Sequence, residues 1–134
     1  MSADSVTEDL TTPGPVSVDV MDRAGTALGI TWPADYLTFM VEHGGGEGWV
    51  GAGYLALWPA NALLETNQLA EVQVNAPHLV GIGGDGADEL FAFDRSAEPP
   101  TLVMVPLVGL DEPVRVGTFS DLLRRLADDD LFIA

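Results

Sequence analysis

The chain has 134 residues and no cysteine, which excludes disulfides and thiolate metal sites and leaves side-chain packing to hold one domain. Five arginines, no lysine and 21 carboxylates give a formal net charge of -16. This balance argues against nucleic acid as a partner, because affinity for phosphates depends on clustered basic side chains, and favours a basic protein instead. With no apolar run of about 18 residues and no basic, apolar amino terminus, we expect a soluble cytoplasmic protein without membrane contact.

The first residues predict a leader. Residues 1–15 are polar and acidic and end in Pro13-Gly14-Pro15. Such a composition buries too little apolar surface to offset the entropy lost on ordering. We therefore expect a disordered leader over residues 1–15, followed by a single domain over residues 16–134.

Two helices are predicted next. Apolar residues at helical spacing indicate a helix over residues 16–28, with Gly29 just past its end. The segment WPADYLTFMVEHGGG places Pro33 at a first helical position, where its missing N–H is not needed. Gly44 then permits the left-handed conformation that often ends a helix, so the second helix is expected to stop at His43.

The middle of the chain mixes strands and a short helix. Residues 49–58, WVGAGYLALW, combine aromatic and aliphatic residues with glycines, which predicts one or two short strands with a bend at Gly51 or Gly53. Residues 59–72, PANALLETNQLAEV, predict a short helix begun by proline. We expect this helix to fray near Asn67.

The second half is rich in strands. The segments HLVGI, ELFAFD, TLVMVPLV and PVRV are short, apolar and separated by turn residues, as in an antiparallel meander. ELFAFD is apolar on both faces, with Phe91 and Phe93 on one of them, which indicates a central strand. A last helix is expected between Thr118, a capping residue, and Ala127. The predicted fold class is α+β, with a mostly antiparallel central sheet of about four to six strands and helices packed against it.

The segment GIGGDG matches the GxGxxG spacing of dinucleotide-binding loops. Such a loop needs a helix after it, whereas ELFAFD follows here, and Asp85, Asp88 and Glu89 would repel a phosphate. We interpret the segment as a hairpin turn with a solvated acidic tip. Calcium bound by these three carboxylates is an alternative, although their spacing does not match a known calcium loop.

Neither histidine has a partner at zinc-binding spacing, and no serine lies in a nucleophile elbow. We therefore predict no catalytic residue, no cofactor and no metal. A small hydrolase or metal enzyme that uses His43 or His78 with two carboxylates remains an alternative.

Three motifs in order carry a family resemblance. WPADYLTFMVEHGGG, HLVGIGGDGADELFAFD and TFSDLLRRL resemble the opening, second and closing signatures of the SUKH superfamily. That superfamily groups fungal regulators of cell-wall assembly with many bacterial immunity proteins. The resemblance runs from about residue 16 to about residue 127.

The resemblance implies a SUKH-like α+β domain without catalytic residues. Bacterial members are commonly encoded beside toxins, often nucleases or deaminases, and neutralise them by binding. A strongly acidic chain suits this role, because a nuclease that binds phosphate has a basic surface. We therefore expect a non-enzymatic immunity protein that binds a cognate basic toxin domain. The alternative is a regulatory or scaffold domain of the same fold without a toxin partner.

The predicted contact residues are acidic side chains at turns and exposed helix ends, with one aromatic anchor. They are Glu42, Glu47, Trp49, Asp85, Asp88, Glu89, Asp111 and Glu112.

Overall fold

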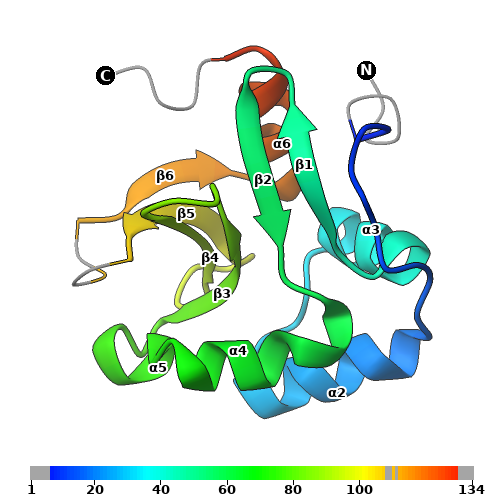
Figure 1. Ribbon diagram of the computed structural model, residues 1–134. Helices are drawn as coiled ribbons and strands as arrows, with labels where there is room; N and C mark the ends of the chain where they lie inside the picture. The colour runs from blue at the N-terminus through cyan, green and yellow to red at the C-terminus, as the bar shows by residue number, and fades with distance from the viewer. Residues whose placement is uncertain (1–6, 108–109, 111, 130–134) are drawn as a thin grey trace.

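A computed structural model describes residues 7–107, 110 and 112–129. These residues form an antiparallel sheet of six strands and five α-helices, which is the α+β fold that the sequence predicts (Figure 1). The strands are β1 (Gly46–Val50), β2 (Gly53–Leu57), β3 (Leu79–Gly84), β4 (Glu89–Asp94), β5 (Thr101–Pro106) and β6 (Val114–Gly117). The helices are α2 (Val18–Leu28), α3 (Ala34–His43), α4 (Leu63–Leu69), α5 (Val72–Asn75) and α6 (Phe119–Ala127), with a 3₁₀ turn η1 (Ala60–Ala62) before α4.

The sheet is a simple meander, in which each strand pairs with the next along the chain. β4 lies between β3 and β5, and its side chains alternate between two cores. Phe91 and Phe93 point into the larger core, and Leu90 and Ala92 into the smaller one. The prediction of a central strand is confirmed, and both of its faces are buried.

Helices cover the two faces unequally. The larger core joins α2, α3 and α6 to one face of the sheet. On the other face, the smaller core contains Val72 and Ala76 from the α5 region, with Trp58 packed against it. Figure 1 shows α2, α4 and α5 across the lower end of the molecule, while the β1–β2 hairpin stands beside α6 at the upper end. On β1 of this hairpin, Glu47 and Trp49 are exposed.

Local signals end α2 and α3 and begin α6 as predicted, whereas α2 begins at Val18 instead of residue 16 and Pro33 directly precedes α3 instead of being its first residue. α2 ends at Gly29 (φ 71°) and α3 ends at Gly44 (φ 76°), both in the left-handed region. At the start of α6, Thr118 Oγ1 accepts a hydrogen bond from the backbone N–H of Asp121 (3.0 Å), and Asp121 Oδ2 accepts from the backbone N–H of Thr118 (2.9 Å). The bond from the Thr118 backbone is the main cause that lowers the pKa of the Asp121 carboxyl.

Two polar side chains join distant elements. Asp35 in the first turn of α3 accepts hydrogen bonds from the backbone N–H (2.9 Å) and the hydroxyl (3.0 Å) of Ser120 in α6. Arg95, just after β4, donates to the carbonyl of Leu28 at the end of α2 and, through Nε, to the carbonyl of Pro77 (3.0 Å). These contacts fix the helices relative to the sheet without adding apolar area.

The prediction of a disordered leader is wrong for residues 7–15. Leu10 is buried in the larger core, and Thr11 pairs with Glu47 through two backbone hydrogen bonds of 2.9 and 3.0 Å. The outer edge of β1 thus supplies bonding partners that the leader's polar composition does not reveal. Residues 1–6 of the predicted leader lie outside the described residues.

The middle segment differs from prediction at one point. Residues 49–58 form parts of two strands with a turn that includes Gly51, as expected. The helix after Pro59, however, does not fray at Asn67. Instead, α4 continues to Leu69 and Asn67 is completely buried. Its side chain bonds to a neighbouring strand, a contact that local sequence does not encode.

Candidate functional site

The hairpin β1–β2 presents two aromatic rings and a carboxylate on its outward side. Glu47 and Trp49 lie two residues apart on β1, so both point away from the larger core. Trp49 is 60% exposed. It pairs across the hairpin with Tyr54, ring centroids 5.3 Å apart at 80°, and the Tyr54 hydroxyl donates to Glu47 Oε2 (2.7 Å). That bond is the main cause that raises the pKa of Tyr54.

The β3–β4 turn abuts this hairpin. A Cβ built on Gly86 would lie 2.7 Å from Cδ1 of Tyr54, so the turn backbone approaches the ring as closely as only glycine permits. Three further acids, Asp85, Asp88 and Glu89, lie in this turn or at the start of β4 directly after it. We call this surface the acidic–aromatic face; it consists of Glu47, Trp49, Tyr54, Asp85, Asp88 and Glu89.

Asp85 contributes a negative charge to the β3–β4 turn and also orders the turn through hydrogen bonds. Its Oδ1 accepts hydrogen bonds from the backbone N–H groups of Ala87 (2.9 Å) and Glu89 (3.1 Å). The side chain thus organises the loop between β3 and β4 in the manner of an Asx turn. Asp88 is exposed, whereas Asp85 and Glu89 are both half-buried, so Asp88 is the best placed of the three carboxylates to contact a partner.

Substituting Asp85 separates these two roles. Asp85→Ala is expected to lower the free energy of unfolding by about 1 to 2 kcal/mol, because two backbone donors lose their acceptor. Asp85→Asn keeps an acceptor oxygen and should retain more of that stability. Urea denaturation of both variants measures the difference, and equal losses would show that the charge, not the hydrogen bonds, sets the turn.

The surroundings of Glu89 destabilise the ionised form of its carboxyl group. Partial burial, and then the neighbouring charges of Asp88 and Asp85, raise the pKa of the Glu89 carboxyl. Among the residues that the structure describes, no basic group forms an ion pair with these three acids. The ionised form of Glu89 therefore disfavours the folded state above its folded pKa, and protonation relieves this cost as the pH falls. A cationic partner would relieve the same repulsion.

The remaining predicted contacts lie elsewhere. Glu42 is at the end of α3, and Glu112 is exposed between β5 and β6. Asp111 lies outside the described residues. The approach of Gly86 to Tyr54 joins the turn that precedes Glu89 and holds Asp85 and Asp88 to the hairpin that carries Glu47 and Trp49, whereas Glu42 and Glu112 lie on other elements.

A hollow of about 310 Å³ beside α3 is lined by His43 together with Glu8 and Glu42. The His43 ring packs on Phe39, with centroids 4.6 Å apart, and its Nε2 is buried 3.8 Å from Glu42 Oε2. That nitrogen is closed to solvent. His78 is exposed before β3.

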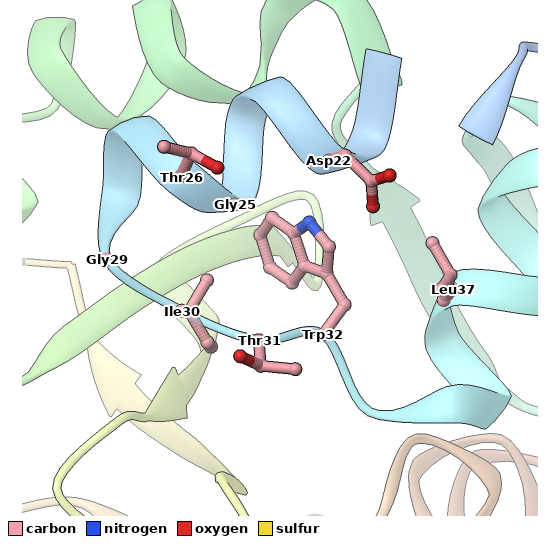
Figure 2. Close-up of a pocket in the computed structure, with 8 residues that line it drawn as sticks. All are labelled: Asp22, Gly25, Thr26, Gly29, Ile30, Thr31, Trp32 and Leu37. Atoms are coloured by element: carbon pink, nitrogen blue, oxygen red, sulfur yellow. The ribbon is translucent and has the colours of Figure 1, made fainter. Parts of the chain in front are cut away.

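A second hollow, of about 420 Å³, lies between α2 and the segment that leads to α3. Figure 2 shows Asp22 and Leu37 to one side of the Trp32 ring and Thr26 to the other. The Trp32 indole N–H donates to the carbonyl of Met21 (2.8 Å), so the ring is fixed by the main chain. None of the predicted contact residues lines this hollow.

The glycine segment is a strand and a turn. β3 runs through Gly84 and β4 starts at Glu89, so a strand follows where a dinucleotide loop requires a helix. In the described part of the chain, no three histidine, aspartate or glutamate side chains are grouped to hold a metal ion. Within the same residues, every helix is too short or too polar to cross a bilayer.

Sequence reasoning missed Tyr54 and Asp9 as members of this region. The signal for Tyr54 was present: a short turn at Gly51 in a hairpin pairs residues 49 and 54 and places both side chains on one side. Asp9 gave no signal, because its place depends on the leader packing against β1. A groove of about 600 Å³ is lined by Asp9, Thr11, Glu47, Gly48, Trp49 and Tyr54.

Comparison of the sequence with models of protein families finds no match, and comparison with characterised proteins finds none either.

Proposed function

We propose that this chain is a non-enzymatic protein-binding module whose acidic–aromatic face binds a basic protein, and that the partner is a cognate bacterial toxin of nuclease or deaminase type. The observation that carries the proposal is the face itself. Glu47 lies beside the exposed Trp49 on β1, three more carboxylates lie in or next to the turn whose Gly86 approaches Tyr54, and none of the ion pairs among the described residues includes these four acids. Exposed aromatic anchors rimmed by charge are typical of protein interfaces.

Two further features support the proposal. A net charge of -16 gives the whole molecule a negative field that accelerates encounter with a basic partner. The three sequence motifs resemble those of SUKH immunity proteins, for which toxin binding is the common role. A regulatory or scaffold domain of the same fold is the second reading of that resemblance.

Charge reversal on the face tests the proposal. Isothermal titration calorimetry measures binding to the protein encoded beside this chain, in salt of about 0.1 M and about 1 M, which shortens the Debye length from about 10 to about 3 Å. We expect Asp88→Lys/Glu89→Lys to weaken binding about tenfold or more, and high salt to weaken the wild-type complex. Affinity should also fall as the pH falls through the raised pKa of Glu89, because the protonated carboxyl no longer attracts the partner.

The matched control is Asp22→Lys/Glu65→Lys, two exposed acids on α2 and α4. Each double variant replaces two negative charges by two positive ones and moves the net charge from -16 to -12. Equal weakening by both would mean that only total charge matters and that the face is not the site. Growth of cells that produce the neighbouring protein separates the two roles: rescue by this chain supports immunity, and binding without toxicity supports a scaffold.

A further inference from the structure

The groove beside Trp49 has the features of a site for one cationic side chain. Gly48 lines the groove between Glu47 and Trp49, and its lack of a side chain lets the leader pack closely, because a Cβ there would lie 3.1 Å from the carbonyl oxygen of Asp9. Trp49 and Tyr54 supply aromatic walls, and the carboxylates of Glu47 and Asp9 supply negative charge. The groove therefore combines ring faces and carboxylates within one hollow.

We propose that this groove binds an arginine side chain of the basic partner; the inference rests on the proposed function and names the chemistry of one of its contacts. A guanidinium is planar, stacks on aromatic rings and donates two parallel hydrogen bonds to a carboxylate. Glu47 Oε2 already accepts from Tyr54, which fixes the orientation of the carboxylate while its other oxygen remains an acceptor. The ammonium group of lysine is not planar, so it can neither stack flat on the aromatic rings nor donate two parallel hydrogen bonds to the carboxylate.

The site also explains why a large aromatic side chain is exposed here. Trp49 is one of the larger apolar groups at the surface, and its ring has an edge-to-face contact with the Tyr54 ring. A partner's guanidinium would cover that ring without requiring the hairpin to move. Preorganised side chains of this kind bind with less loss of conformational entropy.

Free arginine tests the groove without any partner. Acetylated, amidated arginine is titrated into the ¹⁵N-labelled protein against acetylated, amidated citrulline, which has a similar shape and no charge. We expect a saturable shift of the Trp49 indole N–H and the Gly48 amide with arginine, and about five- to tenfold weaker binding of citrulline. Trp49→Phe assigns the indole signal.

Two variants and a control complete the test. Trp49→Ala and Glu47→Gln should each weaken arginine binding by about fivefold or more; glutamine retains an oxygen that can accept from Tyr54, so the hairpin is preserved. Glu65→Gln, on α4, should change nothing. Equal binding of citrulline, or shifts spread over all acidic surfaces, would overturn the proposal.

The same variants separate this inference from the proposed function. If Asp88→Lys/Glu89→Lys weakens the complex with the neighbouring protein while Trp49→Ala and Glu47→Gln do not, the arginine site is wrong and the face remains the interface. If none of these variants weakens the complex, the proposed function is wrong.

Discussion

Replacing Asn67 with leucine is expected to lower the free energy of unfolding by about 3 kcal/mol or more. Asn67 is completely buried in α4. Its side-chain amide forms the hydrogen bonds with the backbone of Gly81 in β3 that a neighbouring strand would otherwise form. Nδ2 donates to the carbonyl of Gly81 (3.0 Å), and Oδ1 accepts from the N–H of Gly81 (2.8 Å). Leucine has a similar volume but leaves both backbone groups unpaired in the core.

The need for this amide follows from the sheet. β2 and β3 pair at only two positions, Ala56 with Gly84 and Leu57 with Gly83, and a bulge separates them from the start of β3. At Gly81, β2 has already left the sheet, so α4 supplies the missing donor and acceptor. Gln73 donates to Asn67 Oδ1 (3.0 Å) and extends the network.

Asn75→Leu is the matched control for Asn67→Leu. Asn75 Nδ2 donates to the carbonyl of Glu71 (3.0 Å), four residues earlier, as Asn67 does to the carbonyl of Leu63 (2.8 Å), but Asn75 is exposed. Its substitution should change the free energy of unfolding by less than about 0.5 kcal/mol in urea denaturation. A wild-type midpoint for Asn67→Leu would show that water or a shifted strand can satisfy Gly81.

Much of the fold could be predicted because its signals are local. Pro33, Gly44 and Thr118 mark helix ends through the conformation or hydrogen bond of a single residue. The alternation of ELFAFD between two apolar faces identified the central strand, and the short apolar segments predicted a meander. None of these signals depends on which distant segments meet.

The features that could not be predicted depend on contacts between segments that are distant in the sequence. Asn67 looks like a residue that ends a helix, and only the bulge in β3 gives it a buried partner. Leu10 and Thr11 look like part of a polar leader, and they are ordered only because Thr11 pairs with Glu47 at the free edge of β1. Of the candidate site, the acids at the β3–β4 turn and the exposure of Trp49 were predictable, whereas Tyr54 follows from the hairpin register.

Gly83→Ala is expected to lower the free energy of unfolding by about 3 kcal/mol or more, at the upper end of the cost of overpacking. A Cβ at this position would lie 2.2 Å from the carbonyl oxygen of Ala56 and 3.0 Å from Cα of Leu57. Both are backbone atoms of β2, so no side chain can rotate to make room. Because Gly83 is in one of the two pairs that join β2 to β3, the strain falls on the junction between the hairpin and the β3–β4 turn.

Hydrogen exchange locates this effect. The N–H of Trp58 donates to the carbonyl of Ile82 (2.9 Å) across the junction, so its exchange should accelerate in Gly83→Ala more than that of amides between β4 and β5. Gly46→Ala is the control: the nearest atoms to its Cβ are side-chain carbons of Leu10 and Thr12 at 3.3 and 3.4 Å, which can move. If Trp58 stays protected in Gly83→Ala, then β2 shifts without separating from β3. In that case the two halves of the acidic–aromatic face remain joined by the contact of Gly86 with Tyr54.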